Sequence, residues 1–162
     1  KTIDYVYKAS IDVYDKHFGG LLIIKKINEQ EHRVVFTTEM GNKLFDFSFF
    51  EDDFKVNFIL DELNKKILIN ILKKDFKVLI TEKINVTNRF SEADNHIFET
   101  IIYNKKHYYY FNENQLSHVI RTKNGKENVQ FLFTEISTNF ANQISIKHNN
   151  IKLQITLKSI TQ

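Results

Sequence analysis

The segment Lys43–Phe58 has the sequence KLFDFSFFEDDFKVNF, which contains two short runs of alternating apolar and polar residues. Every second position of each run is apolar: Phe45, Phe47 and Phe49 in the first run, and Phe54, Val56 and Phe58 in the second. Successive side chains of a β-strand point to opposite faces of a sheet, so this period of two predicts two strands, each with one apolar face. The acidic residues 51–53 between the runs predict a solvated turn.

Similar runs rich in Ile, Val, Phe and Tyr lie on both sides of this segment, separated by short polar or glycine-bearing links. They predict about eleven strands, in residues 5–14, 19–27, 33–38, 43–50, 54–58, 96–103, 106–111, 116–123, 127–136, 143–148 and 151–160. Asn124-Gly125 predicts a two-residue hairpin, because a type I′ turn needs positive φ at both central positions. Asn149-Asn150 joins the last two strands with residues that tolerate the left-handed region. The predicted fold is therefore mainly β (α+β) and antiparallel.

The periodicity changes at Asp61, where apolar residues begin to recur at three-, four- and five-residue spacing with lysines between them. The residues of this stripe are Leu63, Ile67, Leu68, Ile71, Leu72, Phe76, Leu79 and Ile80. The spacing predicts an amphipathic helix of about five turns, with Asp61 as its N-cap and a break near Asp75. We expect the helix to cover one face of the sheet or one mouth of a barrel, since the sheet offers the only large apolar surface. The polar segment 81–95 is expected to be a loop with room for a short extended piece.

Length and charge limit the classes of protein to which the chain can belong. Its 162 residues are 42% hydrophobic, which predicts a single domain spanning residues 1–162. The 23 basic and 20 acidic residues are mixed along the sequence, whereas nucleic-acid-binding proteins concentrate basic charge in a stripe. We therefore expect no nucleic-acid partner. The longest apolar run, Leu21–Ile24, is far shorter than the roughly 20 residues of a membrane-spanning helix.

No catalytic or metal-binding motif is found in the sequence. The six histidines form no HxH or HxxxH pair, there is no cysteine, and the four glycines form no phosphate-binding loop. The serines lack a GxSxG motif. The carboxylates Glu51, Asp52 and Asp53 suit a solvated turn better than a glycosidase pair. We therefore expect no catalytic residue, no metal and no cofactor, and the chain is predicted not to be an enzyme.

Aromatic residues are abundant, with 15 phenylalanines and seven tyrosines. A well-packed core accounts for most of them. However, the predicted strands and helix exceed what one flat sheet can bury, so we expect a curved sheet around the helix, and such a fold readily leaves an apolar cavity.

Residues 18–49 resemble the LolA/LolB-like outer-membrane lipoprotein localisation family, and in particular its LolB-type receptors. The segments that carry the resemblance are GGLLIIK at 19–25 and HRVVFTTEMGNKLFDF at 32–47. In that family a basic residue opens an apolar strand, the strand ends in threonine, and a short loop carries an apolar residue followed by glycine. A new alternating strand then begins. The order of elements is similar over nearly the whole chain. Two features differ: the family's N-terminal helix is missing or lies upstream of Lys1, and Glu39 stands where the family often has proline.

The resemblance implies an incomplete antiparallel β-barrel of about eleven strands with a mid-chain helical lid and an interior that accepts acyl chains. It also implies attachment to the periplasmic face of the outer membrane by a lipid anchor, with the signal and anchor segment upstream of Lys1. Met40 and Gly41 would form the transfer loop. The lid and the cavity beneath it would be formed by ten apolar residues: Ile67, Leu68, Ile71 and Leu72 in the lid, and Phe36, Phe45, Phe47, Phe58, Phe131 and Phe133 in the cavity wall.

Three functional hypotheses remain open at the level of the sequence. The first is a monomeric envelope protein that binds the acyl chains of a lipoprotein or other lipid and transfers them to the outer membrane. The second is a structural or protein-interaction lipoprotein of the same fold, with an interior filled by phenylalanine side chains. The third is an enzyme whose motif is not recognised. An empty apolar cavity would favour the first, a filled interior the second, and a buried cluster of titratable groups in a cleft the third.

Overall fold

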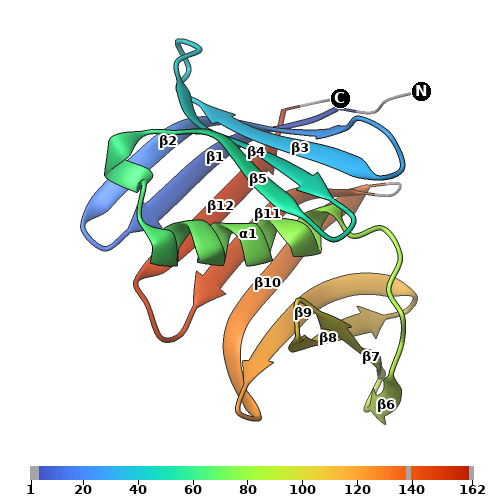
Figure 1. Cartoon of the computed structure of the whole chain (residues 1–162). Coiled ribbons are helices and arrows are strands. Elements are labelled where there is room, and N and C mark those ends of the chain that lie inside the picture. The colour runs from blue at the N-terminus through green and yellow to red at the C-terminus, as the bar shows by residue number, and fades with distance from the viewer. Residues whose placement is uncertain (1–3, 138–139, 161–162) are drawn as a thin grey trace. The chain divides into compact units, whose positions relative to one another are not determined.

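The computed structural model describes residues 4–137 and 140–160 (Figure 1). Its strands are β1 (Asp4–Val13), β2 (Lys16–Lys26), β3 (Glu31–Thr37), β4 (Lys43–Phe50), β5 (Phe54–Ile59), β6 (Asn88–Glu92), β7 (Asn95–Ile102), β8 (Lys105–Asn112), β9 (Gln115–Lys123), β10 (Lys126–Ser137), β11 (Phe140–His148) and β12 (Leu153–Ser159). A short 3₁₀ helix, η1 (Asp61–Leu63), and the helix α1 (Lys66–Ile80) follow β5.

The strands form a 12-stranded open sheet in the order β5-β4-β3-β2-β1-β12-β11-β10-β9-β8-β7-β6. The mainly β, antiparallel fold class with one mid-chain helix is therefore confirmed. The additional strand is β6, which lies within segment 81–95, where a loop with a short extended piece was expected. In the described residues, no helix is both long enough and apolar enough to cross a membrane.

The chain divides into two compact units, which we describe separately. The first contains residues 1–10, 18–81 and 158–162, and the second contains residues 11–17 and 82–157. The strands β1, β2 and β12 contribute residues to both units. The single domain expected from the sequence stays a prediction.

In the first unit, β2 to β5 pair as an antiparallel meander whose apolar rows meet across the strands. Leu22 lies opposite Phe36, and Phe36 lies opposite Phe45; all three side chains are fully buried. This arrangement is what the alternation in Lys43–Phe50 predicts, because residues that are directly opposite share a face of the sheet. The aromatic face of β4 therefore forms the centre of the core of this unit.

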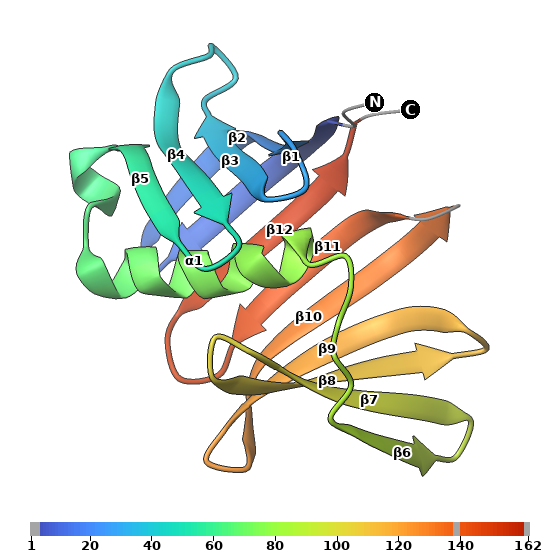
Figure 2. The same ribbon diagram turned by 45° about the vertical axis from the view of Figure 1, so that its right-hand side comes forward.

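The helix α1 covers this aromatic face (Figures 1 and 2), because Leu68, Leu72 and Phe76, four residues apart, form its buried stripe. Two sequence expectations about this helix are wrong. Asp61 does not cap α1: it begins η1, residues 64 and 65 follow, and α1 starts at Lys66. Leu63 reaches the core from η1 instead, so the apolar spacing extends beyond the helix itself. Asp75 does not break the helix and is fully buried within it.

In the second unit, tight turns connect successive antiparallel strands from β6 to β10. The predicted hairpin at Asn124-Gly125 joins β9 to β10 with φ values of 53° and 75°. Two similar turns, at residues 103–104 and 113–114, also have positive φ at both positions but contain no glycine. Asn149 and Asn150 lie in the link from β11 to β12, as expected, but neither has positive φ. Instead, the backbone N–H of Asn149 donates to the carbonyl of Asn128 at 2.9 Å.

Candidate functional site

The aromatic core between α1 and the sheet of the first unit contains three of the residues predicted to line a cavity. The rings of Phe45 and Phe47 stack with their centroids 4.4 Å apart and 10° between their planes. Phe36 lies 5.3 Å from Phe45, and Phe76 of α1 lies 5.7 Å from Phe45 on the helix side. Phe36, Phe45 and Phe47 have no exposed surface. An acyl chain could therefore contact these rings only if the rings or α1 moved.

Leu68 and Leu72 lie on the buried stripe of α1, as the predicted lid requires, and Ile71 is partly buried. Ile67 does not lie on this stripe: it is 72% exposed. The reason is geometric, because consecutive residues of a helix differ by about 100° in direction, and Leu68 already faces the sheet. The expectation that Ile67 faces the core is therefore wrong.

Phe58 is also misplaced by the sequence pattern, since its side chain is 42% exposed. The pairing of β4 with β5 shifts between Asp46 and Phe47, so that Phe58 lies opposite Asp46 and Ile59 lies opposite Phe45. A β-bulge of this kind inserts one residue and reverses the faces beyond it. Ile59 thus takes the position on the aromatic face that strict alternation assigns to Phe58.

The remaining two predicted cavity residues, Phe131 and Phe133, belong to β10 in the second unit. Phe131 is fully buried, and Phe133 is partly buried. The guanidinium carbon of Arg121 lies 5.3 Å from the centroid of the Phe131 ring, and Nε of Arg121 donates to Nε2 of His107 at 3.0 Å. Both polar side chains are buried. Arg121 is not among the predicted site residues, although its position two residues after Val119 on β9 places it on the same face.

The loop between β3 and β4 contains Met40 and Gly41, the residues of the predicted transfer loop. Met40 is 90% exposed, and Gly41 has a φ of 93°. Bonds within the loop define its shape: the N–H of Thr38 donates to the carbonyl of Asn42 at 2.8 Å, and the N–H of Gly41 donates to the carbonyl of Thr38 at 2.9 Å. The loop therefore presents an unbranched apolar side chain to solvent on a hydrogen-bonded base. Its backbone projects beyond the ends of β3 and β4 (Figure 1).

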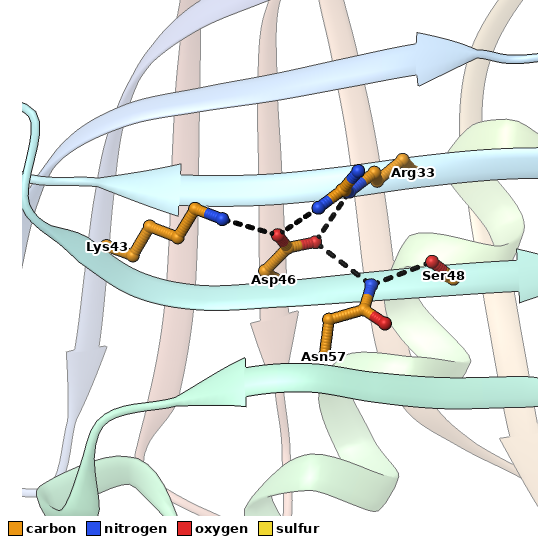
Figure 3. Close-up of polar contacts among 5 residues, drawn as sticks. All are labelled: Arg33, Lys43, Asp46, Ser48 and Asn57. Carbon is orange, nitrogen blue, oxygen red and sulfur yellow. Dashed lines mark hydrogen bonds and ion pairs between the residues drawn. The ribbon is translucent and has the colours of Figure 1, made fainter.

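A polar cluster lies on the opposite face of β4, around the fully buried carboxylate of Asp46 (Figure 3). Arg33 of β3 donates to both carboxylate oxygens, from Nε at 2.9 Å and from Nη2 at 2.6 Å. Nζ of Lys43 donates at 2.9 Å, and Nδ2 of Asn57 donates at 3.2 Å. Asn57 also donates to the hydroxyl of Ser48. The cluster thus links β3, β4 and β5 from the face opposite α1.

These contacts alter the proton affinity of Asp46. The hydrogen bonds from the Arg33 guanidinium hold the pKa of the Asp46 carboxyl well below its usual range, against the opposing effect of burial. Lys43 and Asn57 add to the same effect. The paired carboxylate in turn raises the pKa of Arg33. Asp46 therefore stays ionised in the folded protein, and its role is to stabilise the sheet rather than to transfer protons.

The second unit contains a solvent-open groove of about 580 Å³ at the turns that follow β1 and β11. Its lining is largely polar and includes Tyr14, His148, Asn149, Asn150 and Lys152. None of the predicted cavity residues lines this groove. Among the described residues, no group of three or more His, Cys, Asp or Glu side chains is arranged to hold a metal ion.

No protein-family model and no curated protein matches the sequence, but solved structures share its fold. A LolA superfamily protein from Nitrosomonas europaea superposes with a TM-score of 0.63 and 8% identity, covering 99% of this chain and 84% of that one. A structure described as an outer membrane lipoprotein-sorting protein domain from Vibrio parahaemolyticus has a TM-score of 0.58 and 7% identity, with 99% and 83% covered. A DUF1329 family protein from Desulfovibrio piger has a TM-score of 0.50 and 7% identity, with 96% and 83% covered.

These comparisons confirm the resemblance at the level of the fold. The chain has a LolA/LolB-like fold, with an open antiparallel sheet and one mid-chain helix. At 7% to 8% identity, the similarity concerns the path of the backbone and not the identity of site residues. The cavity and transfer-loop residues therefore stay predictions.

Proposed function

We propose that this protein binds the acyl chains of a lipoprotein or another lipid in an apolar interior and transfers them to the outer membrane of a bacterium, without covalent catalysis. The observation that supports this proposal most directly is the LolA/LolB-like fold, in which a helix with an apolar stripe covers an aromatic face of the sheet. Structures of this fold include one described as a lipoprotein-sorting domain. The protein would act at the periplasmic face of the outer membrane, held by a lipid anchor upstream of Lys1.

The start of α1 supports its role as a lid that can move. Its N-cap, Lys65, makes no side-chain capping bond, and the first turn contains no acidic residue. Lys65 and Lys66 instead place positive charge at the positive end of the helix dipole, which is unfavourable. Displacement of α1 would expose the aromatic face of β4, and each methylene of an acyl chain buried there contributes roughly 0.8 kcal/mol. A single copy of the chain would provide the binding surface.

Met40 provides the first test of this proposal. Replacing the exposed thioether by a carboxylate in Met40→Asp should weaken binding to phosphatidylethanolamine/phosphatidylglycerol vesicles by about tenfold or more, since a charged group does not enter the acyl region. Thermal stability should stay unchanged, because the side chain is 90% exposed. Vesicle co-sedimentation measures the first quantity and circular dichroism measures the second.

Ile101→Asp is the matched control, because Ile101 is also an exposed apolar residue, at 54%, but lies in β7. It should leave vesicle binding unchanged. Equal losses in the two variants, or no loss with Met40→Asp, would contradict a specific role of the loop.

The second candidate function is a structural or protein-interaction lipoprotein with the same fold. The close ring contacts among Phe36, Phe45 and Phe47, and their complete burial, favour a side-chain-filled interior. In that case α1 would remain packed on the sheet, and the protein would retain no lipid.

A further inference from the structure

The strand β6 ends the sheet, and all five of its residues are exposed. It pairs with β7 in five consecutive pairs without a register shift. Natural edge strands are protected from pairing by short length, charged side chains, proline or a bulge. β6 is short and carries Arg89 and Glu92, but it contains no proline, no lysine and no bulge. In the part of the chain that the structure describes, the outer side of β6 has no neighbouring strand.

The backbone groups on that outer side can be identified from the pairing with β7. Glu92 lies opposite Asn95 across a two-residue turn, so these two residues form a hydrogen-bonded pair. Just before the other end of the strand, the N–H of Thr87 donates to the carbonyl of Glu99 at 2.8 Å. Hydrogen-bonded and non-hydrogen-bonded pairs alternate along an antiparallel ladder. The N–H and C=O of Phe90 therefore face β7, whereas those of Arg89 and Ser91 point away from the sheet.

A row of apolar and aromatic side chains ends at this edge. Phe90, Ile97, Tyr110, His118 and Leu132 lie opposite one another in five neighbouring strands, on one face of the second unit. The rings of Tyr110 and His118 stack at 4.2 Å, and the ring of Phe90 lies 6.4 Å from that of Tyr108. Phe90 is 47% exposed at the open end of the row.

We propose that a second copy of this chain pairs with this edge, β6 against β6, antiparallel and about a two-fold axis through Phe90. In this register Arg89 lies opposite the second copy's Ser91, and Asn88 lies opposite its Glu92. The N–H and C=O groups of Arg89 and Ser91 then form four hydrogen bonds between the copies. The two Phe90 side chains form a non-hydrogen-bonded pair, in which side chains approach most closely.

Charge favours this register over its neighbours. An axis through Arg89 would place the two Arg89 side chains opposite each other, and like charges in that position are destabilising. With the two-fold axis through Ser91, the outward N–H and C=O groups of Arg89 would lie opposite residue 93 of the second copy. Residue 93 belongs to the turn after β6, so these groups would lack a partner within the strand. A five-residue strand gives a small interface, so the dimer should be weak and concentration-dependent. The sequence predicts a monomer, and no residue pattern in it marks β6 as the edge of the sheet; the proposed pairing gives a weak dimer instead. The proposed dimer does not depend on lipid binding.

Cysteine cross-linking tests the register, because the chain contains no cysteine of its own. Under mild oxidation, Phe90→Cys should form a covalent dimer at least about tenfold faster than Arg89→Cys or Ser91→Cys, since only residue 90 lies opposite itself. Ile101→Cys is the control for exposure, because it lies on the same face but in β7. Equal rates in all four variants would overturn the proposed pairing.

Sedimentation velocity at increasing concentration tests the dimer without a covalent bond. The unmodified chain should show a rising dimer fraction, Phe90→Lys should reduce it, and Ile101→Lys should not. A chain that stays monomeric throughout, or a dimer that persists in folded Phe90→Lys, would overturn the proposal.

Discussion

Gly20→Ala is expected to lower the free energy of unfolding by about 3 kcal/mol, the upper part of the range for overpacking in a well-packed core. Gly20 is buried in β2, and a Cβ at this position would lie 1.9 Å from the carbonyl oxygen of Thr37 and 3.1 Å from Cα of Thr38. Both are backbone atoms, so the clash can be relieved only by separating β2 from β3. In a chain of this length, the midpoint of thermal unfolding should fall by roughly 6–12 °C.

Gly41→Ala is the matched control for this variant. A Cβ on Gly41 would meet no atom within 4 Å, but its φ of 93° is unfavourable for alanine. We expect a loss of about 1 kcal/mol from backbone strain alone. Thermal denaturation followed by circular dichroism measures both variants. If Gly20→Ala were no less stable than Gly41→Ala, the close approach of Gly20 to the backbone of Thr37 and Thr38 would be contradicted.

Asp46→Asn is expected to destabilise the protein by about 2 kcal/mol at pH 7, because it removes the buried charge that Arg33 and Lys43 share. The loss is moderate since both basic side chains are half exposed and can be solvated. The folded-state pKa of Asp46 is lowered, so its contribution is fully present above the unfolded value of about 3.9 and disappears as the pH falls through the folded value.

Urea unfolding at pH 7, 5 and 3 tests this dependence. The difference in the free energy of unfolding between the unmodified chain and Asp46→Asn should be similar at pH 7 and pH 5 and smaller at pH 3. Asp12→Asn is the control, because Asp12 forms an exposed ion pair with His17 and should contribute little. A difference that does not change with pH would show that the charge of Asp46 is not the stabilising feature.

The sequence predicts the fold of this protein well wherever the side-chain pattern is local. The alternation of Phe45, Phe47 and Phe49 identifies β4 and its buried face, and the spacing of Leu68, Leu72 and Phe76 identifies the face of α1 that meets the sheet. These patterns follow directly from the periods of strands and helices. The resemblance in residues 18–49 adds the fold family, which the solved structures confirm.

Features that depend on pairing between strands were not predictable. A bulge in β5 turns Phe58 away from the aromatic face, and no local residue marks that bulge. Similarly, Asp46 was expected only to face away from the aromatic side. Its contacts with Arg33 and Asn57 depend on the register of three strands. The sequence also does not predict whether a cavity exists, because side-chain packing decides whether space remains beneath α1.

The most direct test of the proposed function is therefore acyl-chain binding by the delipidated protein. Native mass spectrometry with palmitate, a phospholipid and a triacylated lipopeptide would measure the occupancy, and Leu72→Asp, on the buried stripe of α1, would serve as the comparison variant. We expect the unmodified chain to bind at least one of these probes, and folded Leu72→Asp to bind it more weakly. If the unmodified protein bound none of the three, the proposal of an acyl-chain carrier would be contradicted, and a protein with a filled interior would remain.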